Sequence, residues 1–211
     1  MAERWLAPAP PLPGAIRAAV GERWWLHVGR CTARKNVETL VEAFARALPG
    51  VQGEMPVLAL VGPPGDADGS VRAAATRLGV TERVRWLGAV DDRTLHGLYA
   101  GAELTACVGA YEGFGLTALE ALACGCPVVR TDAGGLPEAA PAGALAAGSA
   151  DAAAIARQLV AIGGDPERRA ALSDAGRRFG AARGAAAAAG ETAMVYAAAA
   201  TAPGHGLARM R

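Results

Sequence analysis

One stretch decides the fold: LTACVGAYEGFGLTALEALACGCPVVRT, residues 104–131. A short apolar run over 104–108 is followed by a glycine-rich segment, by apolar residues at helical spacing over 116–124, and by a second apolar run over 127–131. Short continuous apolar runs are typical of strands buried on both faces, and parallel strands need a crossover, which is usually a helix. The stretch therefore predicts two parallel strands joined by a helix.

The same alternation continues on both sides of this unit. Further strands are predicted over 24–28, 57–61 and 84–87, with a weak last strand over 143–147. Helices are predicted near 15–20, 37–48 and 70–79, after Asp91-Asp92, over 151–162, from Asp165-Pro166-Glu167 and from 184. Strands that alternate with helices in this way predict an α/β fold, a doubly wound parallel sheet with helices on both faces.

Three segments are predicted along the chain. Residues 1–22 are a proline-rich lead-in, 23–182 form a Rossmann-like domain, and 183–211 form an alanine-rich helical tail. Ligands of such sheets bind beyond the carboxyl ends of the strands. The loops expected at that edge are 29–36, 62–69, 88–91, 109–115 and 131–137.

Composition excludes several classes of protein. The chain is 52% hydrophobic and 19% charged, so disorder is not expected. Its 21 Lys and Arg against 20 Asp and Glu leave a net charge of +1, with no global attraction to nucleic acid or anionic lipid. No run has the length of a signal peptide core or a transmembrane helix, so a cytoplasmic protein is expected. The four cysteines form no C-x-x-C pair, and we expect small buried residues rather than metal ligands.

Two carboxylates stand out in YEGFGLTALEALACGCPVV, residues 111–129. Glu112 precedes the predicted helix and Glu120 lies inside it, where a carboxylate among apolar residues is costly unless it is paired or bound to a ligand. Gly113 and Gly115 let the backbone approach a ligand, and the amides at a helix start favour an anion. The alternative is a glycine turn with Glu112 solvated and Glu120 at a rim.

Two cations follow the first predicted strand in VGRCTARKN. Arg30 and Lys35 lie in a loop at the ligand edge, where fixed positive charge can stabilise a diphosphate without a metal. The alternative is a solvated basic turn that includes Arg34.

These motifs resemble the retaining GT-B glycosyltransferases often called glycosyl transferases group 1. Glu112 and Glu120 match the E-x7-E motif of that family, and the match continues through LEALACGCPVV into DAGGLPE. The resemblance covers roughly residues 24–200 and corresponds to the C-terminal, donor-binding domain of the family.

The resemblance implies roles for particular residues, all in binding a nucleoside-diphosphate sugar. Glu112 would contact the sugar hydroxyls, Glu120 would hold the ribose, and Arg30 and Lys35 would clamp the diphosphate. The remaining donor-binding positions that it implies are Gly29, Gly88, Val90, Gly113, Phe114, Gly115 and Leu116. It also implies retention of anomeric configuration, without a metal or a cofactor.

The chain departs from the family in length, because only about 23 residues precede the first predicted strand. We therefore expect the acceptor-binding half to be absent or supplied as a separate subunit. Two other functions stay open. One is a non-catalytic nucleotide-sugar-binding module. The other is a dinucleotide-dependent oxidoreductase, since Gly113, Gly115 and Ala118 fit G-x-G-x-x-A and Asp132 follows the next strand.

Three further residues carry structural expectations. Asn36 is predicted to cap the helix that begins at Val37, His27 to lie in the core, and His96 to lie on a surface helix.

Overall fold

The computed structural model describes residues 3–183 and 185–201 and contains a six-stranded sheet in the order β3-β2-β1-β4-β5-β6, with every neighbouring pair parallel. The strands are β1 Trp24–Val28, β2 Val57–Val61, β3 Val84–Gly88, β4 Leu104–Cys107, β5 Val128–Arg130 and β6 Ala144–Ala146. All six predicted strands are present, including the weak last one. The predicted doubly wound parallel sheet is confirmed.

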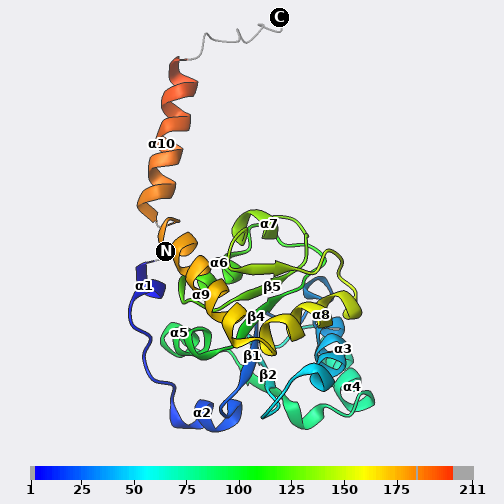
Figure 1. Ribbon diagram of the computed structural model, residues 1–211. Coiled ribbons are helices and arrows are strands. Elements are labelled where there is room, and N and C mark those ends of the chain that lie inside the picture. The colour runs from blue at the N-terminus through cyan, green and yellow to red at the C-terminus, as the bar shows by residue number, and fades with distance from the viewer. Residues whose placement is uncertain (1–2, 184, 202–211) are drawn as a thin grey trace, which may run out of the picture.

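Helices cover both faces of the sheet (Figure 1). The helices of the described residues are α1 Glu3–Leu6, α2 Gly14–Val20, α3 Val37–Ala47, α4 Asp68–Arg77, α5 Asp92–Gly101, α6 Leu116–Ala123, α7 Leu136–Ala139, α8 Ala152–Gly163, α9 Pro166–Ala181 and α10 Ala185–Thr201, and all but α10 lie against the body of the domain. One core cluster joins α3, α4 and α8 to the sheet, and a second joins α1, α2, α5 and α6 to the opposite face. Both faces of the sheet are thus covered by buried apolar side chains, which explains why the strands are apolar along their whole length.

The proline-rich lead-in packs onto the second face. Trp5 is buried, with its ring edge-on to His96 at 5.6 Å and to Tyr99 at 5.7 Å. His96 lies on a helix as predicted, but its side chain is not at the surface. The imidazole is buried because the lead-in covers α5.

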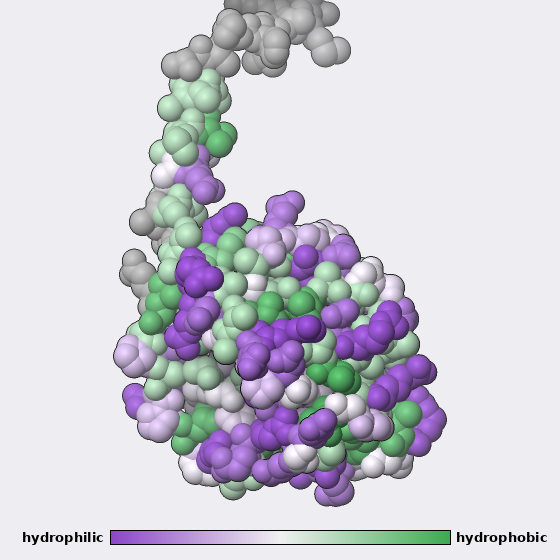
Figure 2. Space-filling model, viewed as in Figure 1, coloured by the Kyte–Doolittle hydropathy of each residue, from purple (hydrophilic) through white to green (hydrophobic). Residues whose placement is uncertain are grey.

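The tail is helical as expected, and α10 projects away from the body of the domain (Figure 1). Its Met194, Val195 and Tyr196 are exposed among alanines, which give the helix its pale surface in Figure 2. Residues 202–211 of the predicted tail lie outside the described residues. Within residues 3–183 and 185–201, no helix combines the length and apolar content needed to cross a bilayer.

The four cysteines are buried and unpaired, as the sequence predicts. Burial raises the pKa of Cys107, Cys124 and Cys126 to about 12, so these thiols stay protonated and unreactive at neutral pH.

Candidate functional site

The candidate site lies where the winding of the sheet reverses. From β1 the chain crosses to β2 through α3, and from β4 it crosses to β5 through α6 on the other face. β1 and β2 pair over five residues, whereas β1 and β4 pair over only two, Trp25 with Leu104 and Leu26 with Thr105. The two central strands therefore diverge towards their carboxyl ends, and this opening is where ligands of doubly wound sheets bind.

Backbone and side-chain contacts tie the two loops that leave this opening. The Ala110 amide donates to the Arg34 carbonyl at 2.9 Å. Asn36 donates from Nδ2 to the Val108 carbonyl at 3.3 Å and to the Ala150 carbonyl at 3.0 Å. Asn36 precedes α3 as expected, but it makes no side-chain capping bond to the helix and has a left-handed backbone, with φ of 55°. Its amide instead joins the β1 loop to β4.

A charged pair bridges the two loops. Lys35, at the end of the 3-10 turn Ala33–Lys35, donates from Nζ to Glu112 Oε2 at 2.5 Å. The Lys35 and Glu112 side chains are only 16% and 21% exposed. Arg34 adds a longer contact of 3.9 Å to the same carboxylate and donates to the Tyr111 carbonyl at 2.7 Å. Two of the three residues predicted to be catalytic are thus in contact.

The third, Arg30, lies in the same loop with an exposed side chain. Within the described part of the chain it makes no side-chain hydrogen bond or ion pair. Its guanidinium is therefore unpaired, whereas the Lys35 ammonium is held by Glu112.

Two glycines that the sequence reasoning assigned no role support the Glu112 backbone. The Gly135 amide donates to the Glu112 carbonyl at 2.8 Å. Gly134 has a φ of +56°, and a Cβ there would lie 2.0 Å from the same carbonyl oxygen. Thr131, buried, donates its hydroxyl to the Gly109 carbonyl at 2.9 Å. The Gly-Gly pair in DAGG was the sequence signal for the contact of Gly134 and Gly135 with the Glu112 carbonyl.

The start of α6 faces the same opening. Gly115, at its N-cap, has a φ of +87°, a conformation that favours glycine. The first amides of a helix have no intrahelical partner, and with the helix dipole they favour an anion. Phe114 and Leu116 beside them are 60% and 41% exposed. Gly113, Phe114 and Leu116 are thus exposed beside the first amides of α6, whereas Gly115 is buried.

A second part of the site lies over β1, β2 and β3. The Gly29 amide donates to the Val61 carbonyl at 2.8 Å, and the Gly62 amide donates to the Gly88 carbonyl at 2.9 Å. These glycines line a cavity of about 190 Å³, where the Arg72 guanidinium lies 4.0 Å from the centre of the Trp86 ring. Gly29 and Gly88 thus come together, but Val90 is outside this lining and packs against the second core cluster.

Glu120 lies on the second turn of α6 and is half-buried. Tyr99, on α5, donates its hydroxyl to Glu120 Oε2 at 3.3 Å. Burial raises the pKa of Glu120, and the Tyr99 hydrogen bond opposes this. Tyr99 is a partner that sequence reasoning missed, because their contact depends on how α5 packs beside α6.

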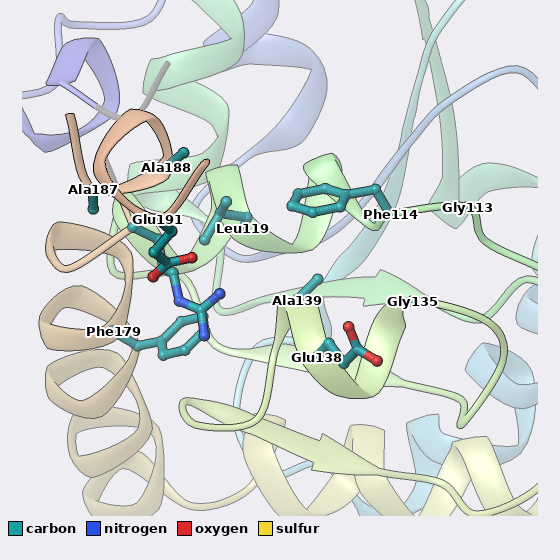
Figure 3. A pocket seen from close by; sticks show the side chains of 11 residues that line it. Gly113, Phe114, Leu119, Gly135, Glu138, Ala139, Phe179, Ala187, Ala188 and Glu191 are labelled. Atoms are coloured by element: carbon teal, nitrogen blue, oxygen red, sulfur yellow. The ribbon is translucent and has the colours of Figure 1, made fainter. Parts of the chain in front are cut away.

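A cavity of about 220 Å³ lies beside Gly113 and Phe114, which precede α6. Figure 3 shows Phe114 and Leu119 along one side, Phe179 and Glu191 along another, and Glu138 and Ala139 of α7 along a third. It contains neither Lys35, Glu112 nor Arg30. We therefore locate the site by the charged pair at the strand opening, although this cavity is the roomier one.

His27, on β1, lies beneath the charged pair. Its Nδ1 is 3.0 Å from the Ala106 carbonyl, and its Nε2 is buried without a partner. Burial lowers the pKa of His27 to about 4, with a smaller contribution from Lys35, so the imidazole is neutral at pH 7. The expectation of a core histidine was correct, but His27 also lines a small cavity together with Lys35 and Glu112.

The sheet order, the strand opening and its ligand-facing loops define a nucleotide-binding type of α/β domain, with the architecture of GT-B glycosyltransferases. The family model of glycosyl transferases group 1 matches residues 13–179, and the chain belongs to that family. The predicted resemblance is confirmed. The match starts before the first strand and includes part of the lead-in.

Three relatives illustrate the similarity. A D-inositol 3-phosphate glycosyltransferase of Mycobacterium tuberculosis is 40% identical over 133 residues, which cover 59% of this chain and 26% of that protein. Sucrose-phosphate synthase from Thermosynechococcus elongatus is 29% identical with a TM-score of 0.72, covering 92% of this chain and 50% of that one. Anabaena Alr3699/HepE in complex with UDP and glucose is 22% identical with a TM-score of 0.75, covering 88% and 51%, and shows the fold alone. The chain thus spans about half or less of the length of these relatives.

The dinucleotide interpretation loses its basis. The glycines that fit G-x-G-x-x-A follow β4, and residues 108–112 separate them from that strand. The dinucleotide fingerprint instead occupies the first βα turn, directly after β1. Asp132, its proposed ribose ligand, forms an ion pair with Arg130.

The contact of Gly134 with Glu112 generates a first prediction. Gly134→Ala should lower the free energy of unfolding by about 2–4 kcal/mol, because backbone strain adds to a steric clash with the Glu112 carbonyl. Gly148→Ala is the control, since Gly148 has a similar φ of +77° but nothing within 4 Å of its Cβ position, and should lose only about 1–2 kcal/mol. Equal losses in urea unfolding would contradict this account.

The burial of His27 generates a second prediction. Its pKa is about 4 in the folded chain and about 6.5 when unfolded, so the folded chain binds fewer protons between these values. The free energy of unfolding should therefore fall by up to about 3 kcal/mol as pH drops from 6.5 to 4. His27→Gln, which cannot titrate, should show a shallower slope in urea unfolding across this window. The lowered pKa of His96 acts in the same direction in both proteins and cancels in the difference. Identical slopes would be inconsistent with a neutral His27.

Proposed function

We propose that this chain is the donor-binding half of a retaining glycosyltransferase and binds a nucleoside-diphosphate sugar at the opening between β1 and β4. The observation that carries the proposal is the Lys35–Glu112 pair, which joins a cation and a carboxylate at the ligand edge of the sheet. A donor of this kind offers an anion to the lysine and hydroxyl groups to the carboxylate. Each member of the pair can therefore exchange its partner for part of the ligand.

The diphosphate is assigned to the cationic side of the opening. Lys35 and Arg30 supply the charge, and the first amides of α6, at Phe114, Gly115 and Leu116, supply hydrogen-bond donors. Two fixed cations can stabilise the charge that develops on a departing diphosphate, and we propose that no metal or other cofactor is required.

The rest of the donor is assigned to the neighbouring residues. Glu112 accepts hydrogen bonds from the hydroxyl groups of the sugar, and Glu120 accepts them from those of the ribose. The base lies over Gly29 and Gly88, in the cavity beside Trp86, with Val90 at its border. The HepE structure, which shares this fold, is a complex with UDP and glucose, and this supports a nucleotide as part of the ligand.

The acceptor is assigned to a second domain or subunit. The chain covers half of the sucrose-phosphate synthase chain and 26% of the mycobacterial relative, so those proteins contain a further part with no counterpart here. We propose that such a part completes the cleft above Tyr111 and Phe114, which are each 60% exposed. Binding without turnover by this chain alone would be the expected behaviour of the donor half.

Nucleotide binding is the first test. UDP, GDP or ADP should bind in calorimetry with EDTA present, and Arg30→Ala or Lys35→Ala should weaken binding by about ten- to a hundredfold, because each removes a charge-assisted contact of about 1.5–3 kcal/mol. Arg46→Ala, which removes a cation from the exposed face of α3, is the control and should leave affinity unchanged. No binding at millimolar nucleotide, an absolute requirement for Mn²⁺, or full affinity in a folded Arg30→Ala protein would each argue against the assignment.

The stereochemistry of transfer is the second test. In the proposed step, the bond between the anomeric carbon and the diphosphate oxygen breaks and its electron pair stays on the phosphate. The acceptor oxygen then bonds to the anomeric carbon on the same face, and its proton passes to the leaving phosphate. Glu112 is paired with Lys35 and is assigned to the sugar hydroxyls, so it does not serve as a nucleophile.

With the acceptor-binding part present, the product should therefore retain its anomeric configuration by NMR. Glu112→Gln should reduce turnover without loss of folding, and mass spectrometry should detect no glycosyl adduct on the protein. Glu167→Gln, a change to an exposed acid at the start of α9, should have no effect. An inverted product or a sugar bound covalently to Glu112 would overturn the mechanism.

A further inference from the structure

His27 is a buried polar group whose hydrogen bonding is half complete. The imidazole leaves β1 where β1 and β4 diverge, and Nδ1 reaches the Ala106 carbonyl of β4 at 3.0 Å. A carbonyl oxygen only accepts, so this contact assigns the proton to Nδ1. The other nitrogen, Nε2, is then a bare acceptor, and it is buried with no donor within reach. A buried polar atom left in this way normally costs stability and needs an explanation.

The surroundings of Nε2 indicate what its partner is. His27 lines a cavity of about 10 Å³, room for about one water molecule, together with Lys35 and Glu112. A Cβ placed on Gly29 would lie 3.5 Å from Lys35 Cε and 3.9 Å from His27 Nε2, so the lysine stem and the nitrogen flank the same point. An ammonium group has three donors, and the structure uses one of them, on Glu112.

We propose that His27 is a positioning residue for Lys35, with Nε2 accepting a hydrogen bond from the ammonium when a diphosphate draws it away from Glu112. This inference rests on the proposed function, since it describes the lysine in its ligand-bound position. The exchange leaves every group paired. Glu112 turns to the sugar hydroxyls, and the ammonium lies between the diphosphate and His27. The acceptor on the protein side keeps the flexible lysine stem in one orientation.

Two amide substitutions, His27→Asn and His27→Gln, distinguish the roles of the two imidazole nitrogens. Asn at this position reaches about as far as Nδ1, so His27→Asn keeps a donor for Ala106 but has no atom at Nε2. Gln reaches as far as Nε2 and presents an acceptor there. Calorimetry with UDP should show about tenfold weaker binding for His27→Asn, and binding within about twofold of the unchanged chain for His27→Gln.

The same substitution in a chain without the ammonium isolates the contact with Lys35. Adding His27→Asn to Lys35→Met should weaken UDP binding no further, because the donor is already gone. Equal losses for His27→Asn and His27→Gln, or a loss that persists with Lys35→Met, would show a merely structural role and overturn the inference. Thermal unfolding of each variant identifies any that does not fold.

A second measurement keeps His27 unchanged and needs no nucleotide. Glu112→Gln removes the carboxylate charge from Lys35, as a bound diphosphate would by competition. The ¹⁵N resonance of His27 Nε2 should then move towards that of a hydrogen-bonded nitrogen, and return when Lys35→Met is added. No movement would overturn the positioning role. If the unchanged chain binds no nucleotide but the resonance moves as expected, the proposed function fails while the contact between His27 and Lys35 stands.

Discussion

The candidate site is centred on the ion pair between Lys35 and Glu112, because it joins the loops that follow β1 and β4, two neighbouring strands whose crossovers leave on opposite faces of the sheet. Parallel strands with opposite crossovers diverge at their carboxyl ends, and here the ladder between β1 and β4 stops after two residue pairs. One backbone hydrogen bond, from the Ala110 amide to the Arg34 carbonyl, helps to hold the loops together beyond that point. A half-buried charge pair does so, and it leaves both charges accessible to a ligand with a complementary charge and hydroxyl groups.

This arrangement concentrates charge in a chain whose net charge is only +1. Arg30, Arg34 and Lys35 lie within six residues, and Arg34 and Lys35 both contact the Glu112 carboxylate. The local field is therefore positive although the whole protein is close to neutral. The anion binding that we propose here depends on three cations of one loop and a helix terminus, and the bulk composition carries no sign of it.

The backbone under the pair is held by groups without charge. Gly134 and Gly135 contact the Glu112 carbonyl, Asn36 ties the β1 loop to β4, and Thr131 holds Gly109. In the proposed binding step Lys35 and Glu112 exchange partners, and these uncharged contacts keep their backbones in place when the pair opens. The two glycines permit an approach of backbone to backbone that any side chain would prevent. They give the charged residues a rigid base from which only the side chains need to move.

The sequence by itself determined the elements and the names of the charged residues. Alternating apolar runs and helical repeats specified six strands, two covered faces and a helical tail, because burial on both faces demands that pattern locally. Glu112, Arg30 and Lys35 were visible as charges next to strand ends. Only the tertiary structure decided that Lys35 pairs with Glu112 while Arg30 is free, that Asn36 bonds to β4 instead of capping α3, that Trp5 buries His96, and that His27 keeps an unpartnered nitrogen below the pair. Those contacts join residues about 70 to 90 positions apart, and their geometry follows from strand order and splay, which no local pattern along the chain encodes.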